Sequence, residues 1–89
     1  MAVICMFYGI TISLYYMDTD KHKRPHIHAR YQDHEVVLSV PEGKVLGGIL
    51  PPNKMKLVQA WIEIHRDELQ ADWALAEQGQ PVFKIEPLR

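Results

Sequence analysis

The stretch Pro25-His-Ile-His-Ala-Arg-Tyr31 decides the fold. Proline has no backbone N–H to give to a strand ladder, so Pro25 is expected at the start of a strand, which then covers residues 26–31. Alternate residues of a strand point to opposite faces of a sheet. We therefore expect the two imidazoles and Arg30 on one, solvent-facing side, with the apolar residues between them facing the core.

The segments on either side of this stretch also follow a two-residue period. Residues 10–16 alternate apolar with polar, and residues 3–7 are apolar and extended, with Gly9 as a break or bulge between them. After a turn at 32–34, two further strands are expected at 35–40 and 44–50, separated by a turn at 41–43. Gly47-Gly48 indicates a bulge or a close backbone approach in the last strand. Short strands with tight links predict an antiparallel meander of about five strands.

At Pro51-Pro52 the apolar period changes to three and four residues, and proline favours the start of a helix. The pattern predicts one long helix over about 52–78, or two consecutive helices with a bend near His65. Gly79 and Pro81 end it, leaving 79–89 as an ordered tail or a short final strand. The whole chain, 1–89, is expected to be a single α+β domain with a β-rich half, 1–50, whose sheet is packed on one face by the helical segment.

The composition excludes several classes of protein. A net charge of −1 over 89 residues argues against a dedicated nucleic-acid binder, and a single cysteine excludes a disulfide scaffold. Cys5 lies in an apolar run and is expected to be a core residue. The N-terminus lacks the features of a signal peptide, and no apolar run could span a bilayer, so we expect a cytoplasmic protein that does not contact the membrane.

Basic and titratable residues concentrate between positions 21 and 30, which contain no acid, whereas residues 62–80 are mainly acidic. Such asymmetry can orient partners even when the total charge is near zero. We expect a binding surface for a partner protein or, alternatively, a nucleic acid, because RNA-binding surfaces combine positive charge with stackable rings. Its candidate residues are Lys21, Lys23, Arg24, His26, His28 and Arg30.

His26 and His28 are also the candidate metal ligands. Two imidazoles on the same face of a strand can bind one divalent transition metal if further ligands converge, and the preceding loop offers His22, Asp18 or Asp20. The spacing fixes only two ligands, so the pattern is more typical of the solvent-facing half of an amphipathic strand than of a metal site. No cofactor is expected.

His65 and the two tryptophans lie on the apolar stripe of the helical segment. We expect His65 to be a hydrogen-bonded core residue, separated from His26 and His28 if the helix covers the opposite face of the sheet. Trp61 and Trp73 are expected to be core anchors, with a dimer surface as the alternative, which leaves both a monomer and a homodimer open.

Five segments of the chain form a recognisable pattern: Phe7-Tyr-Gly-Ile10, Pro25-His-Ile-His-Ala29, Gly43-Lys-Val-Leu-Gly47, Leu57-Val-Gln-Ala-Trp61 and His65-Arg-Asp-Glu-Leu69. Together they resemble the small bacterial proteins grouped as domain of unknown function 4160. The resemblance covers nearly the whole chain, and its most specific part is the Pro-x-His-x-His-Ala core. Members often carry a second proline where this chain has Arg24, and phenylalanine where it has Ile27.

The resemblance implies a cytoplasmic bacterial protein without an established enzyme activity, whose gene often lies beside that of another small protein. We therefore expect a non-enzymatic interaction module, in an arrangement that looks like a toxin–antitoxin pair. One alternative is a histidine-dependent hydrolase or nuclease, in which His26 and His28 serve as acid, base or metal ligand. The other is a dimerising structural domain.

Overall fold

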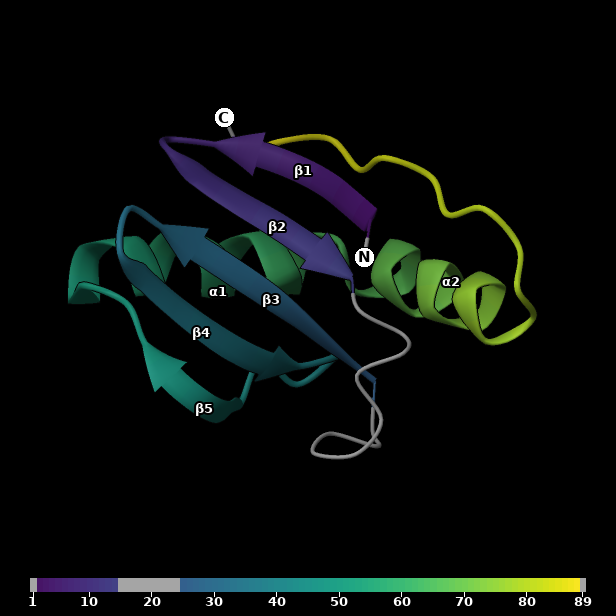
Figure 1. Ribbon diagram of the computed structural model, residues 1–89, viewed down its shortest axis with the longest axis horizontal. Helices are drawn as coiled ribbons and strands as arrows, with labels where there is room; N and C mark the ends of the chain where they lie inside the picture. The colour runs from purple at the N-terminus through teal and green to yellow at the C-terminus, as the bar shows by residue number, and fades with distance from the viewer. Residues whose placement is uncertain (1, 15–24, 89) are drawn as a thin grey trace.

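The computed structural model describes residues 2–14 and 25–88, and these form an α+β fold of five strands followed by two helices (Figure 1). The elements are β1 (Ala2–Phe7), β2 (Ile10–Leu14), β3 (His26–Tyr31), β4 (His34–Ser39), β5 (Val45–Ile49), α1 (Pro52–Ile64) and α2 (Arg66–Glu77).

The strands form one antiparallel sheet in the order β1-β2-β3-β4-β5, which confirms the predicted meander. Two-residue turns join β1 to β2 and β3 to β4, and Tyr8, Gly9 and Gln32 have positive φ there, as hairpin turns of this length require. Gly9 is thus a turn residue. His34, expected in a turn, is instead the exposed first residue of β4.

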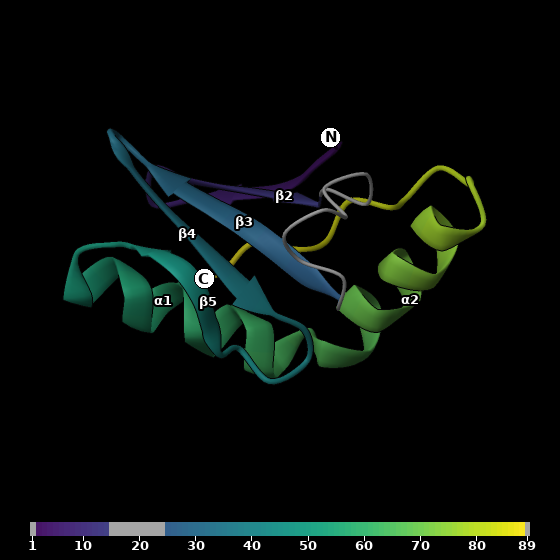
Figure 2. The same ribbon diagram turned by 60° about the horizontal axis from the view of Figure 1, so that its bottom comes forward.

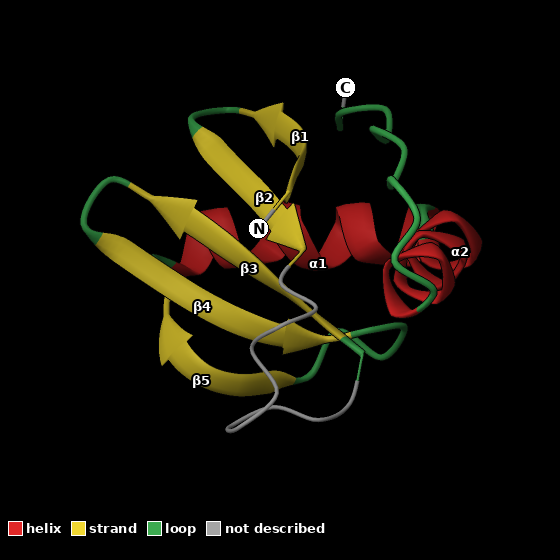
Figure 3. Cartoon of the chain, turned by 45° about the vertical axis from the view of Figure 1, so that its right-hand side comes forward, coloured by secondary structure: helices red, strands yellow, loops and turns green. Residues whose placement is uncertain are grey.

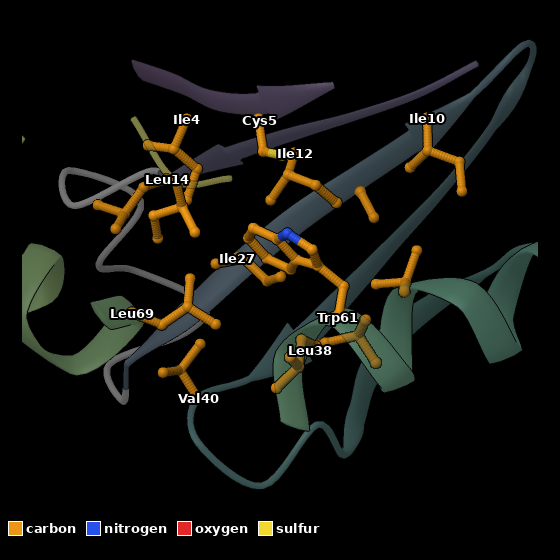
Figure 4. Close-up of a cluster of buried hydrophobic side chains, with 14 of the residues drawn as sticks. Ile4, Cys5, Ile10, Ile12, Leu14, Ile27, Leu38, Val40, Trp61 and Leu69 are labelled. Carbon is orange, nitrogen blue, oxygen red and sulfur yellow. The ribbon is translucent and has the colours of Figure 1, made fainter. Parts of the chain in front are cut away.

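The helix α1 covers one face of the sheet, and the core lies between them (Figure 2). The indole of Trp61 is fully buried at its centre, among aliphatic side chains from the sheet and from α2 (Figure 4), and its ring lies 5.7 Å from that of Phe7. Cys5 is buried in the same core, and this burial raises the pKa of its thiol. A protonated, buried thiol fits the predicted core residue.

The helical segment is divided at His65, which settles the choice between one helix and two. Pro52 is the first residue of α1, as predicted, and His65 leaves the helical conformation with φ −111° and ψ 29°. The backbone hydrogen bonds from His65 N to the Trp61 oxygen and from Leu69 N to the His65 oxygen continue through this residue, so α2 follows directly at an angle (Figure 2). None of the described helices is long and apolar enough to cross a membrane.

Residues 78–88 form an ordered tail without a strand, the first of the two predicted alternatives (Figure 3). Hydrogen bonds at residues 83–86 hold it against α1, α2 and the sheet. Phe83 N donates to Asp72 Oδ1 at 3.0 Å, and Trp61 Nε1 donates to the Glu86 oxygen at 2.8 Å. Ile85 N donates to the Ile4 oxygen at 2.8 Å, which places the tail beside the outer edge of β1.

Gly48 is where the expected close backbone approach occurs. Its φ is +79°, and a Cβ at this position would collide with the backbone carbonyl of Glu35 on β4 and lie 3.1 Å from the Val36 Cα. A Cβ on Gly47 would meet nothing within 4 Å. Only one of the two adjacent glycines is therefore required by the structure.

We expect Gly48→Ala to lower the free energy of unfolding by roughly 1–3 kcal/mol. The alanine would have to adopt a left-handed backbone conformation, and its Cβ would collide with the Glu35 carbonyl. The matched control Gly47→Ala should have a much smaller effect. Urea denaturation followed by circular dichroism measures both. Equal losses for the two variants would contradict the assignment of the close approach to Gly48.

Asp72 is buried, and burial raises the pKa of its carboxyl, with a smaller contribution from nearby Glu68, while the Phe83 N–H acts in the opposite direction. Its Oδ2 has no hydrogen-bond partner among the described residues. Because the folded-state pKa exceeds the unfolded one, the protonated form favours folding at low pH, and this stabilisation is lost as the pH rises through the raised pKa.

Asp72→Asn should therefore be more stable than wild type at neutral pH by about 1 kcal/mol, since an uncharged amide still accepts the Phe83 N–H. The gap should close as the pH approaches the pKa of an ordinary aspartate, about 4. Denaturation at several pH values tests this, with Asp72→Ala, which removes the acceptor, expected to be less stable than Asp72→Asn. A stability difference between Asp72→Asn and wild type that widens towards acid pH would contradict a raised pKa of Asp72.

Candidate functional site

The predicted alternation along β3 is present. Ile27 and Ala29 are fully buried in the core under α1, and His26, His28 and Arg30 project from the other face. Residues paired across antiparallel strands share a face, and the register pairs these three with Ser39, Val37 and Glu35 of β4, respectively. We call the side of the sheet opposite α1 the histidine face.

The expectation that both histidines face solvent is wrong. His26 is 0% exposed and His28 is 9% exposed. For His26 a physical reason lies in α2, which bends away from α1 and brings the Trp73 ring to 5.3 Å from the His26 ring. The neighbouring Ser13 and Ser39 are buried as well, so this end of the sheet is covered on both faces. Of the predicted binding residues on β3, only Arg30 is exposed.

A carboxylate connects the buried and exposed parts of this face. Glu35 Oε2 shares a hydrogen bond of 2.8 Å with His28 Nδ1, and Glu35 Oε1 accepts from Arg30 Nη2 at 3.3 Å. The His28 hydrogen bond lowers the pKa of the Glu35 carboxyl, partial burial acts in the opposite direction, and Arg30 adds to the lowering. Glu35 is therefore held as an anion between a buried imidazole and an exposed guanidinium.

The other half of the histidine face, near the β1–β2 and β3–β4 turns, carries a row of exposed and partly exposed side chains. The register links one residue from each strand in turn, and these partners lie side by side across the whole sheet. The two ends of the row are apolar and strongly exposed, Met6 at 66% and Ile49 at 70%. We call this set the exposed row: Met6, Thr11, Arg30, Glu35 and Ile49.

Sequence reasoning missed Met6 and Ile49. Met6 occupies the outward position between the buried Cys5 and Phe7, which the period of two could have indicated. Ile49 follows Gly48, whose positive φ interrupts the alternation of β5, so its direction could not be read from the pattern. Their joining into one row depends on strand register, which no local signal in the sequence contains.

Comparison with known families matches residues 9–74 to the model described as Domain of unknown function (DUF4160). The chain belongs to the DUF4160 family. The matched segment runs from the β1–β2 turn into α2 and includes all of β3. No curated protein and no solved structure matched the chain.

In this DUF4160 chain, His65 belongs to the helices and not to the histidine pair. Its ring lies 5.4 Å from that of Trp61, and its Nδ1 is 2.6 Å from Glu68 Oε1. The rings of His26 and His28 lie 5.4 Å apart, with both Nε2 atoms buried. Within residues 2–14 and 25–88, no three histidine, cysteine, aspartate or glutamate side chains are grouped so that they could hold a metal ion.

The remaining predicted site residues precede β3. Lys21, Lys23 and Arg24, and the additional metal ligands His22, Asp18 and Asp20, lie outside the described residues. Their part of the predicted binding surface and metal site stays a prediction.

Trp61 and Trp73 are buried within the monomer, as core anchors should be. A dimer of this DUF4160 protein through either tryptophan therefore lacks an exposed surface to form on. Any dimer must use another part of the molecule.

Glu35→Gln should weaken the link between the two halves of the histidine face. Because the folded-state pKa of Glu35 is below the unfolded one, its ionised form stabilises the fold above the unfolded pKa, and this contribution disappears as the pH falls through the folded pKa. The carboxylate is partly exposed, so we expect a loss below about 1 kcal/mol at pH 7. Denaturation of variant and wild type between about pH 7 and pH 3 measures it, and a pH-independent difference would contradict it.

Proposed function

We propose that this DUF4160 protein is a small, non-enzymatic protein-binding module whose partner contacts the exposed row. The observation that carries the proposal is that Met6 and Ile49, two large apolar side chains at opposite edges of the sheet, are exposed on the same face. Apolar side chains that alternate with polar ones across one surface suit contact with another protein, whose interfaces combine both kinds of group.

The surroundings of the row support this role. In Figure 1 α1 lies behind the sheet, and α2 lies beside the end of the sheet where β3 begins. The half near the two hairpin turns therefore offers a surface that is built on strands. Binding to it requires little ordering of this chain, so little conformational entropy is lost.

A protein partner fits the row better than a nucleic acid does. Nucleic acids bind through several cations that contact phosphates. The exposed row has one cation, Arg30, and its guanidinium already contacts the Glu35 carboxylate. The net charge of the row is therefore near zero, which suits a surface of mixed polarity on another protein.

The hydrolase or nuclease alternative receives less support from the geometry. Acid–base and metal chemistry need a ring nitrogen that a substrate can reach. The Nε2 atoms of His26 and His28 are buried, and the Nδ1 of His28 is engaged with Glu35. The family resemblance adds a setting for the module, a toxin–antitoxin-like pair with a protein encoded by a neighbouring gene, and this too is part of the proposal.

Affinity capture from cells that naturally express the protein tests the proposed function. Wild type and Ile64→Asp, which alters a 64%-exposed isoleucine on α1, should retain the same identified partner. Ile49→Asp should lose at least about 90% of it, because the charge replaces an apolar contact at a binding surface. Arg30→Glu should weaken capture as well.

Mass spectrometry identifies the captured protein, and circular dichroism confirms that each variant is folded. A partner that all four proteins retain equally would show that binding does not use the exposed row. Capture of nucleic acid alone would refute the protein-binding role.

A further inference from the structure

The charges of the exposed row are arranged so that the row complements itself. Arg30 on β3 and Glu35 on β4 are direct neighbours, and the row has no other charge. We propose, building on the proposed function, that the partner is a second copy of this chain, whose exposed row packs face to face on this one.

The order of the strands determines the symmetry axis that relates the two copies. A twofold axis that runs parallel to the strands, midway between β3 and β4, reverses the strand order of the second copy. Arg30 then faces Glu35 of the partner subunit, and Glu35 faces Arg30 of the partner subunit. Facing sheets pack about 10 Å apart, a gap that an arginine and a glutamate reaching from opposite sides can bridge.

The same rotation brings the apolar residues together. Thr11, one strand from Arg30, faces Ile49 of the partner subunit, because each lies one and a half strand spacings from the axis. Met6 lies one strand further out, about 4.8 Å to the side, where its flexible side chain can pack against that isoleucine. Each copy thus supplies both halves of every contact, as an isologous interface requires.

The four charges at the centre form a network. Each Arg30 keeps its own Glu35 at 3.3 Å and gains a second one across the axis, since a guanidinium has five donors and a carboxylate accepts several hydrogen bonds. Such a network is more effective than an isolated surface pair. The net charge of −1 per chain adds little repulsion between the two copies.

The size of the row sets the expected affinity. Five side chains offer less than the roughly 800 Å² per partner of a standard interface, so the dimer should be weak, with a dissociation constant in the range of about 10 µM to 1 mM. Association should therefore depend on concentration and weaken with added salt.

Analytical ultracentrifugation of the full chain between about 10 µM and 1 mM tests the proposal by charge exchange. Wild type should move from monomer to dimer across this range. Arg30→Glu alone and Glu35→Arg alone should each associate at least about tenfold more weakly, because like charges then face each other. An equimolar mixture of the two variants should regain dimer, since the two carboxylates of the first variant then face the two guanidinium groups of the second.

A second pair of variants leaves the Glu35–His28 hydrogen bond intact. Ile49→Asp should abolish association, and Ile64→Asp should associate like wild type. A wild type that stays monomeric at 1 mM, single charge variants that dimerise like wild type, or a mixture that fails to recover would each overturn the homodimer. If the chain is monomeric yet a different protein is captured through Ile49, the proposed function survives without the homodimer; if neither occurs, both fail.

Discussion

The burial of Trp61 is the constraint on which the rest of this structure depends. Its indole fills the space between α1 and the sheet, lies against Phe7 of β1, and donates its N–H to the carbonyl of Glu86 in the tail. One side chain therefore joins the sheet, the helix and the C-terminal segment. An indole nitrogen buried without an acceptor would be costly, so the tail is needed to complete the core as well as to cover it.

The sequence was informative where periodicity alone determines structure. The alternation in Pro25–Tyr31 predicted the correct faces of β3, and Pro52 marked the start of the helical segment. The burial of His26 could not be predicted in the same way, because alternation says which residues share a face and not whether another element covers that face. The Trp73 contact depends on the angle between α1 and α2 at His65, where the sequence has no Gly or Pro to mark a bend.

The two carboxylate oxygens of Glu35 lie in different environments on the histidine face. One oxygen is bonded to an imidazole in a covered region, and the other to a guanidinium in contact with solvent. Any group that binds Arg30 therefore competes for a carboxylate that also positions His28. Buried His28 and the exposed row are in this way joined by hydrogen bonds through Glu35.

The two edges of the sheet carry different features that oppose further strand pairing. The tail runs beside β1 and donates Ile85 N–H to it, while at the other edge the β4–β5 pairing shifts register between Val37 and Leu38, next to the left-handed Gly48. Unprotected edges let sheets from different molecules join without limit, and both devices oppose that growth. In the proposed homodimer, contacts through the face of the sheet would end at a closed pair of subunits, while the features at both edges oppose the addition of further strands.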